Sequence, residues 1–294
     1  MATEVEREIP TQPEMWRRAA EVAASAGDRL PAVGSRVAVV GCGTSWFVAQ
    51  AYACRRESVG GGVTDAFAAS EAPVTRDYDV LVAVSRSGTT TEVARLLPEM
   101  PAGTRTVAIT GVAESPIAHA ADDVILLDFA DERSVVQTRF ATTALALLRA
   151  SLGEDLGPVA RDGEEALHRS LPEGLAAFEH FVFLGRGWTV GLANEAALKF
   201  REAAQAWTES YPAMEYRHGP ISVAGPKSIV WSLGGVGQDV LRDVEATGAT
   251  VVSSDLDPMA ELVVAQRAAI ALAASRGLDP DRPRHLTRSV VLPE

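Results

Sequence analysis

The sequence contains few cysteines, few aromatic residues and no long uncharged apolar run. Its 294 residues include only Cys42 and Cys54, too few for a disulfide framework or a cysteine-rich metal site. No apolar run reaches the roughly 18 residues typical of a membrane span. The N-terminus alternates charges where a signal peptide would have an apolar core. We therefore expect a soluble, cytoplasmic protein with reduced thiols and no membrane partner.

Basic residues are also in short supply. The chain has 27 Lys and Arg against 39 Asp and Glu, a formal charge of 27 − 39 = −12. Such a balance argues against a surface that coats nucleic acid. The histidines His119, His168 and His180 are scattered without metal-ligand spacing. We therefore expect no nucleic-acid partner, no metal and no cofactor.

Short apolar runs alternate with helical patterns along the first half of the chain. Strands are predicted at residues 36–40, 63–67, 80–84, 105–110 and 124–127, and helices at 46–58, 90–100, 116–120 and 138–152. This alternation is typical of βαβ units around a parallel sheet that is covered on both faces. The length of the chain allows one large or two medium domains.

The pattern restarts after a charged connection at residues 153–173. Strands are predicted at 181–184, 228–233 and 250–254, and helices at 192–209, 239–247 and 258–276. Both halves open with an apolar strand that runs into a glycine turn, GCGTS and GRGWT. The sequence therefore predicts an α/β fold with two similar domains, each a parallel sheet flanked by helices on both faces. We place a lead-in at 1–30, the domains at 31–155 and 156–276, and a tail at 277–294.

The first candidate site is the turn Gly41-Cys42-Gly43-Thr44-Ser45, between a strand and a helix. Glycines let such a turn approach a ligand closely, and its hydroxyls and free helix N–H groups can hold an anion. The alternative is a plain strand–helix turn with Ser45 as the N-cap. Trp46 stands where a dinucleotide fingerprint would need its third glycine.

The second candidate is residues 85–92, SRSGTTTE, which also follow a strand and open a helix. Five hydroxyl side chains fall within seven positions around Gly88. A capping box would need only Thr89 and Glu92. The surplus hydroxyls suit a phosphate monoester, whose oxygens accept hydrogen bonds. No lysine follows the glycine, so the turn is not a nucleotide P-loop.

Two such turns at the carboxyl ends of parallel strands lie where open sheets usually bind ligands. Together, GCGTS and VAVSRSGTTTE resemble the phosphate-binding turns of SIS (sugar isomerase) domains. The whole chain resembles the two-SIS isomerase half of glutamine–fructose-6-phosphate aminotransferase and its stand-alone relatives. The resemblance implies a phosphorylated sugar as the small-molecule partner. The ligand-binding residues it implies are Ser85, Arg86, Ser87, Gly88 and Thr90 at the phosphate, and Thr44, Ser45 and Gln137 beside the sugar.

The third candidate is the helical stretch NEAALKFREAAQAW with the turn that follows it. Glu195, Lys199 and Glu202 fall on one helix face, where Glu195 and Lys199 have the spacing of a surface ion pair. His218 could belong to a plain turn. The resemblance instead implies that Glu202 transfers the proton between C1 and C2 and that His218 opens the sugar ring. It also matches Lys199 to a family lysine. These residue types suit an aldose–ketose isomerisation.

In this family the histidine usually enters the site of a neighbouring subunit, so we expect a homodimer. Two departures from the family pattern bear on the reaction. Arg288 stands where the aminotransferase has a lysine that engages the open-chain sugar, and an arginine cannot form a Schiff base. The chain also begins Met1-Ala2-Thr3, without the family's glutaminase cysteine after the initiator. We expect that it does not make ammonia from glutamine.

The leading hypothesis is an isomerase or deaminase that acts on an amino-sugar 6-phosphate, with Glu202, His218 and Arg288 as its catalytic residues. A second hypothesis is a deglycase that releases an amine from a phosphorylated Amadori product by the same proton abstraction. A third is a non-catalytic sugar-phosphate sensor. Glu202 and His218 favour an enzyme, whereas Arg288, which replaces the family lysine, is compatible with the sensor hypothesis.

Overall fold

A computed structural model describes residues 2–292, which divide into two compact units, and each unit is described by itself. The first-sheet unit holds residues 14–133, 137–157 and 287–292. The second-sheet unit holds residues 2–13, 134–136 and 158–286. Helix α2 (Gln12–Ala26) begins at the boundary between them.

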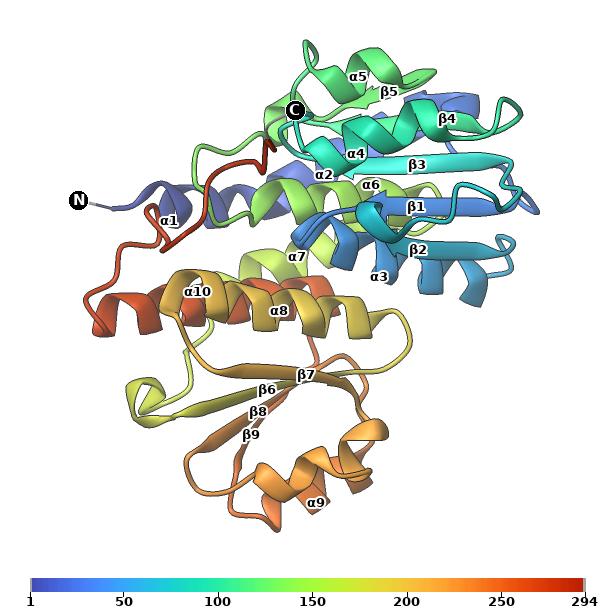
Figure 1. Cartoon of the computed structure of the whole chain (residues 1–294). Coiled ribbons are helices and arrows are strands. Elements are labelled where there is room, and N and C mark those ends of the chain that lie inside the picture. The colour runs from blue at the N-terminus through green and yellow to red at the C-terminus, as the bar shows by residue number, and fades with distance from the viewer. Residues whose placement is uncertain (1, 293–294) are drawn as a thin grey trace. The chain divides into compact units, whose positions relative to one another are not determined.

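The first-sheet unit contains a five-stranded parallel sheet in the order β2-β1-β3-β4-β5. Its strands are β1 (Val37–Gly41), β2 (Thr64–Ala68), β3 (Val80–Ser85), β4 (Arg105–Thr110) and β5 (Asp123–Leu126). Strands β1 and β3 are buried along their whole length, as expected of a sheet covered on both faces. All the carboxyl ends therefore lie along one edge (Figure 1).

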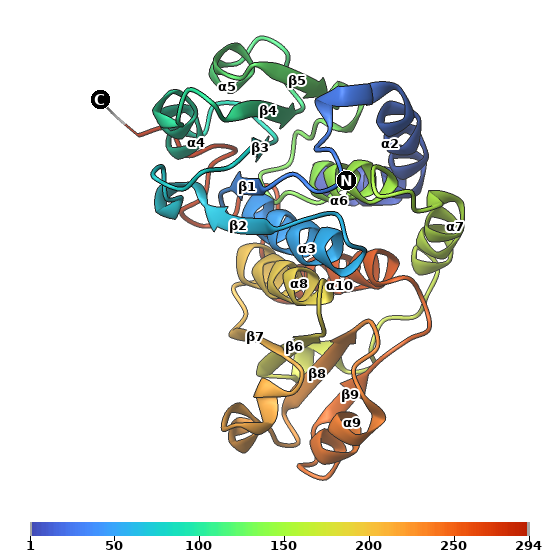
Figure 2. The same ribbon diagram turned by 90° about the vertical axis from the view of Figure 1, so that its right-hand side faces the viewer.

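Helices cover both faces of this sheet. They are α3 (Thr44–Ser58), α4 (Thr91–Leu96), α5 (Pro116–Ala120) and α6 (Arg139–Ala150). Helices α4 and α5 pack on one face, where Val93 and Ile117 join Val40, Leu81 and Ala108 in one apolar cluster. The end-on view in Figure 2 shows α2, α3 and α6 on the opposite face. There, Trp16 of α2 donates a 2.9 Å hydrogen bond to Thr142 of α6.

The second-sheet unit has a four-stranded parallel sheet in the order β7-β6-β8-β9. Its strands are β6 (His180–Gly185), β7 (Thr208–Pro212), β8 (Ser228–Leu233) and β9 (Thr250–Val252). If the strands of each sheet are numbered in chain order, the order β7-β6-β8-β9 is the same as the order β2-β1-β3-β4 in the first sheet. The two sheets therefore share a strand order, with β6 in the position of β1 and β8 in that of β3.

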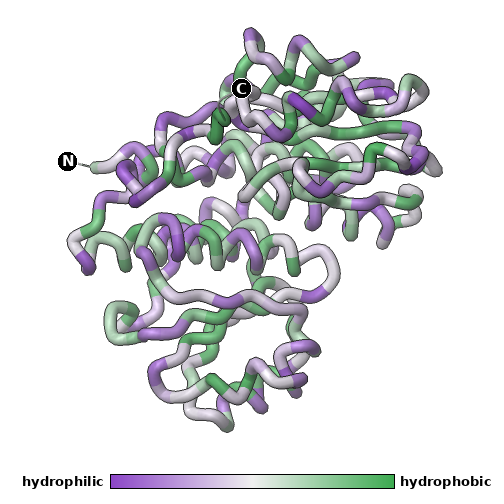
Figure 3. Tube along the Cα trace, in the orientation of Figure 1, coloured by the Kyte–Doolittle hydropathy of each residue, from purple (hydrophilic) through white to green (hydrophobic). Residues whose placement is uncertain are grey.

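The helices of this unit are α1 (Glu4–Glu8), α7 (Leu156–Ala166), α8 (Thr189–Ala204), α9 (Gln238–Glu245) and α10 (Pro258–Ser275). Figure 1 shows α8 and α10 on one side of the sheet and α9 on the other. Aromatic rings fill the first interface, where Phe200 of α8 lies 5.0 Å from Phe181 and 5.1 Å from Phe183, ring centre to ring centre. Figure 3 shows hydrophobic stretches in both sheets.

Two local expectations, both near the end of α8, were wrong. The helix expected at 192–209 ends at Ala204, because Gln205 adopts a left-handed conformation (φ 50°) that terminates it. Strand β7 follows at once; it is an edge strand with half-buried side chains, so it lacks an apolar run. The connection at 153–173 contains α7. No described helix combines the length and the apolar character that crossing a bilayer requires.

Candidate functional site

The turn after β3 gathers the hydroxyl side chains that the sequence singled out. Ser85 ends the strand, and α4 begins at Thr91 with Thr90 as its N-cap residue. The hydroxyl of Ser85 is buried and has no hydrogen-bond partner among the described residues. Because Thr90 rather than Thr89 is the N-cap residue and no side chain makes a cap bond, the alternative of a capping box from Thr89 and Glu92 does not form. Capping therefore does not explain the hydroxyls of this turn.

The backbone conformation of this turn requires a glycine at position 88. Its φ of 65° lies in the left-handed region that disfavours residues with a side chain. A Cβ at this position would lie 2.1 Å from Ser115 Oγ and 2.4 Å from Ser115 Cβ. Ser115 cannot retreat freely, because its Oγ accepts the 3.3 Å bond from Ala118 N that caps α5. The turn is therefore held against the start of α5 at a point where only glycine fits.

The C-terminal tail lies on the same turn. The hydroxyls of Ser87, Thr89 and Ser289 form a triangle with separations of 3.0 Å, 3.1 Å and 2.9 Å. Thr91 N donates to Val290 O at 3.2 Å, which links the tail to the first turn of α4. The guanidinium of Arg288 pairs with Asp131. The backbone carbonyl of Arg288 accepts a 2.9 Å hydrogen bond from Arg86 Nη2. The structure therefore brings Arg288 to the predicted phosphate turn.

The turn after β1 places Thr44 and Ser45, both buried, at the start of α3. The N-cap residue is Gly43 with φ 53°, so Ser45 is not the cap that the alternative reading required. A Cβ on Gly41 would lie 2.6 Å from the carbonyl carbon of Ser45, which shows how closely the helix approaches the strand. Burial, reinforced by the nearby Glu92 carboxylate, raises the pKa of Cys42 to about 11, so its thiol is not an activated nucleophile.

Gln137 precedes α6, and its Oε1 atom is buried without a hydrogen-bond partner among the described residues. The adjacent backbone is held by Glu132, whose Oε1 accepts from Thr138 N at 2.8 Å and from Arg139 N at 2.7 Å. Glu132 Oε2 lies 3.8 Å from Arg86 Nη1. The first-sheet unit therefore joins the 85–91 turn, the tail and the start of α6 in one polar cluster.

In the second-sheet unit, Lys199 lies between two carboxylates on α8. Its Nζ is 3.3 Å from Glu195 Oε1 and 2.5 Å from Glu202 Oε2. The side chains of Lys199 and Glu195 are buried, whereas 18% of that of Glu202 is exposed. Burial alone lowers the pKa of Lys199, but the two carboxylates outweigh it and raise the pKa above its ordinary value. This cluster is not a surface ion pair, and Glu202 is its accessible carboxylate.

His218 follows the short 3₁₀ helix η7 (Glu215–Arg217) and is exposed. Its backbone N–H donates a 2.9 Å hydrogen bond to Glu215 O. Because the residue is exposed, its imidazole is accessible to a substrate or a partner.

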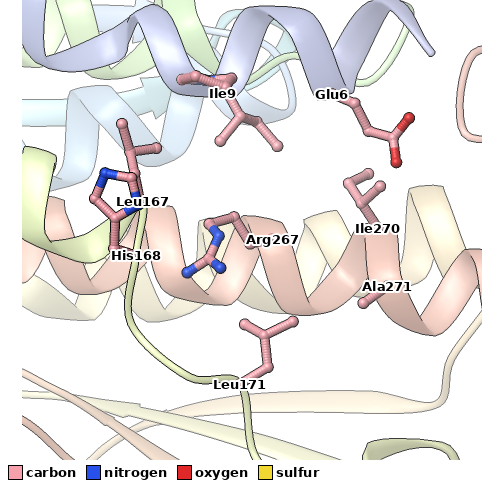
Figure 4. Close-up of a pocket in the computed structure, with 9 residues that line it drawn as sticks. Glu6, Ile9, Leu167, His168, Leu171, Arg267, Ile270 and Ala271 are labelled. Atoms are coloured by element: carbon pink, nitrogen blue, oxygen red, sulfur yellow. The ribbon is translucent and has the colours of Figure 1, made fainter. Parts of the chain in front are cut away.

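A pocket of about 370 Å³ also lies in the second-sheet unit, at the end of α7 and along α10 (Figure 4). Its walls are mostly apolar and include Ile9, Leu167, Leu171 and Ile270. Arg267 also lines it and donates to the carbonyl oxygens of Ala166 and Arg169 at 2.6 Å and 2.8 Å. None of the sequence-predicted site residues lines this pocket, so it is not the site that the motifs indicate.

The sequence analysis did not identify two residues of the polar cluster, Glu132 and Ser289. Neither belongs to a hydroxyl-rich or glycine-rich motif. Ser289 is 202 positions from Ser87 in the sequence, so no local pattern reports their contact. Glu132 could have been noticed as an acidic residue six positions before Thr138, where a helix was predicted to begin.

Comparison with known proteins shows what part of the chain is similar to. Residues 33–152 match the sequence model of the SIS domain, which does not extend to the second sheet. A glutamine–fructose-6-phosphate aminotransferase (isomerizing) of Sulfurisphaera tokodaii is 29% identical in a match that covers 87% of this chain and 50% of that protein. The chain therefore spans about half the length of the curated relatives it matches.

Among solved structures, glucosamine-6-phosphate deaminase from Thermotoga maritima superposes with a TM-score of 0.84 at 26% identity. The match covers 99% of this chain and 100% of that one. Tagatose-6-phosphate ketose/aldose isomerase from Escherichia coli has a TM-score of 0.81 at 21% identity, with 99% and 97% covered, which shows a shared fold.

Proposed function

Because residues 33–152 match the sequence model of the SIS domain, we propose that this chain is a phosphosugar isomerase that acts on an amino-sugar 6-phosphate as an isomerase or deaminase. The name of the Thermotoga maritima neighbour supports this substrate class, since that match covers nearly the whole of both chains. The shared strand order of the two sheets supports a second, divergent SIS-type domain at 156–276, beside one at 31–155.

One observation carries the proposal: the hydroxyl-rich turn after β3 begins with a buried hydroxyl that its own fold leaves without a partner among the described residues. Ser85 Oγ is buried without a partner among the described residues, and no side chain caps α4. A buried hydroxyl without a partner is costly to stability, so it indicates a polar ligand. A phosphate supplies acceptors for Ser85, Ser87 and Thr90, and the Arg86 guanidinium adds charge complementarity.

The proton-transfer step is assigned to α8. Glu202 is the accessible carboxylate of its cluster and acts as the base between C1 and C2 of the open-chain sugar. Lys199 holds that carboxylate in place through a contact of 2.5 Å and contributes a positive charge beside it.

Ring opening is assigned to His218, because an imidazole can both donate and accept a proton and can therefore move one between the ring oxygen and O1. Its exposure is consistent with a role across a subunit interface, and we include a homodimer in the proposal. Thr44, Ser45 and Gln137 line the sugar, and Arg288 closes the tail over the phosphate turn. Sedimentation velocity on the purified chain tests the dimer.

The proposal is tested by incubating the chain with glucosamine, galactosamine, fructose and tagatose 6-phosphates. Product sugars and released ammonia are measured separately. The expected result is conversion of at least one hexosamine 6-phosphate, together with thermal stabilisation by that ligand. Release of an amino acid from a fructosyl-amine 6-phosphate, without hexosamine turnover, would establish the deglycase instead. Binding without any turnover would establish the sensor, and no response to any sugar phosphate would contradict all three.

A further inference from the structure

Glu132 occupies an unusual position in the first-sheet unit. Its side chain is fully buried, yet neither the phosphate turn nor any motif of the sequence contains it. A buried carboxylate is costly unless it is paired and hydrogen-bonded, so its partners show what it is for. Those partners come from two different segments of the candidate site.

One side of Glu132 organises the start of α6. Its Oε1 accepts hydrogen bonds from Thr138 N, Thr138 Oγ1 and Arg139 N at 2.8 Å, 2.9 Å and 2.7 Å, and its Oε2 accepts from Phe140 N at 3.1 Å. This carboxylate is thus the N-terminal cap of a 12-residue helix that has no cap bond from Thr138 itself. It also fixes the backbone next to Gln137, whose buried Oε1 has no partner among the described residues.

The other side of Glu132 faces the phosphate turn. Its Oε2 lies 3.8 Å from Nη1 of Arg86, and only 3% of the Arg86 side chain is exposed. Arg86 stands between Ser85 and Ser87, and its Nη2 donates to Arg288 O at 2.9 Å. A buried guanidinium needs an anionic neighbour, and Glu132 supplies a carboxylate that forms an ion pair with Arg86.

We propose that Glu132 is a positioning residue, which fixes Arg86 and Gln137 relative to one another so that the 85–91 turn and the start of α6 present one preorganised surface to the phosphosugar. The inference rests on the proposed function. Ser85 and Gln137, each with a buried oxygen that has no hydrogen-bond partner among the described residues, belong to the two segments that Glu132 links. Preorganised contacts bind more tightly because fewer groups must be ordered when the ligand arrives.

Two effects of Glu132 on an anionic ligand oppose one another. Its charge alone repels phosphate, so neutralising it would tighten binding if Coulomb repulsion dominated. Arg86 and the N-terminus of α6 already offset that charge, however. We therefore expect the loss of orientation to dominate and binding to weaken. The sign of the change separates a positioning role from simple repulsion.

The test uses Glu132→Gln, which keeps the size of the side chain and one acceptor oxygen but loses the charge that faces Arg86. Glu261→Gln is the matched control, because Glu261 is also a buried carboxylate with side-chain partners, Trp231 and Ser254, but lies in the second-sheet unit. Arg86→Gln and the double variant Glu132→Gln/Arg86→Gln complete a cycle. The readouts are KM and kcat for the best sugar phosphate, the Kd of inorganic phosphate by calorimetry, and Tm.

We expect Glu132→Gln to raise KM and the phosphate Kd by about tenfold while kcat falls less than about threefold. In the Arg86→Gln background, Glu132→Gln should alter the phosphate Kd by less than about twofold, because the guanidinium that Glu132 positions is already absent. Glu261→Gln should change only Tm. If Glu132→Gln does not fold, Glu132→Asp replaces it. This variant keeps the charge but moves it away from Arg86, and the same rise in KM and in the phosphate Kd is expected.

An unchanged or lower KM in a folded Glu132 variant overturns the inference and leaves the proposed function standing. Equal effects in the wild-type and Arg86→Gln backgrounds overturn it too, because Glu132 then acts independently of Arg86. If the wild-type chain binds and converts no sugar phosphate, the proposed function fails first, and the inference falls with it.

Discussion

The turns after β3 and β8 occupy equivalent places in two sheets of the same strand order, yet their side chains differ completely. Residues 85–91 carry five hydroxyls around one glycine, whereas residues 233–237 read LGGVG and carry none. The first turn contacts the tail through Ser87 and Thr89. The second leads into α9 through Gly237, which makes no side-chain cap bond. A shared topology therefore supplies two equivalent edges, and side-chain chemistry decides which one can hold an anion.

The second-sheet unit carries its polar chemistry elsewhere, on α8. Its buried Lys199 sits between Glu195 and Glu202, a charge cluster suited to proton transfer rather than to phosphate binding. The comparison thus divides the proposed work, with ligand binding assigned to the first-sheet unit and acid–base chemistry to the second. Each half of that division can be tested separately.

The largest expected effect comes from Glu202→Gln. The amide cannot accept the C1/C2 proton, so kcat should fall by about 100-fold to 10,000-fold while the Kd of the sugar phosphate changes less than about twofold. Steady-state kinetics and calorimetry measure the two quantities. Glu245→Gln, an exposed carboxylate at the end of α9, is the control and should leave both unchanged. A kcat within threefold of wild type would remove Glu202 from the chemistry.

The two turns should also differ in their tolerance of a methyl group. Gly88→Ala combines an unfavourable φ of 65° with a Cβ that would lie only 2.1 Å from Ser115 Oγ. We expect it to lower the free energy of unfolding by about 2–4 kcal/mol. Gly235→Ala should change it by less than about 0.5 kcal/mol, because nothing lies within 4 Å of its added Cβ. Urea unfolding measures both, and equal losses would contradict the constraint assigned to Gly88.

Removing one hydroxyl tests whether the 85–91 turn binds phosphate. Ser87→Ala should raise the Kd of the sugar phosphate by about 10–100-fold, the usual cost of one hydrogen bond to a charged group. The reciprocal change, Gly235→Ser, adds a hydroxyl to the second turn, where the Cβ has open space. Calorimetry should detect no new phosphate site in this variant, because a lone hydroxyl lacks the other groups of the set. A phosphate affinity unaltered by Ser87→Ala would place the anion elsewhere.

The smallest effect is expected where the tail meets Asp131. The Arg288–Asp131 pair is partly exposed, with 38% and 30% of the side chains accessible. Asp131→Asn should therefore cost less than about 1 kcal/mol, and the loss should shrink at high salt. Thermal unfolding at low and high ionic strength checks both points. A larger, salt-independent loss would mean that the pair fastens the tail more firmly than its exposure suggests.

The resemblance of the two turns to SIS domains is confirmed over residues 33–152, and the predicted parallel sheets flanked by helices are confirmed in both units. Apolar strands such as 80–84 were predictable because a strand buried on both faces needs a continuous run of β-branched and other apolar residues. Strand β7 was not, since its sequence TESYP has the mixed composition of a half-buried edge. Only the backbone of Gln205 reveals where the preceding helix stops.

The sequence by itself determined which chemistry each turn contains. Hydroxyls at 85–91 and carboxylates at helical spacing on 195–202 are local properties that no folding event can add or remove. The tertiary structure decided which of those groups are buried, paired or left without a partner. Glu132 meets Arg86, and Ser289 meets Ser87, through contacts between residues far apart in the chain. Such contacts depend on packing around the completed sheet, which no local sequence pattern records.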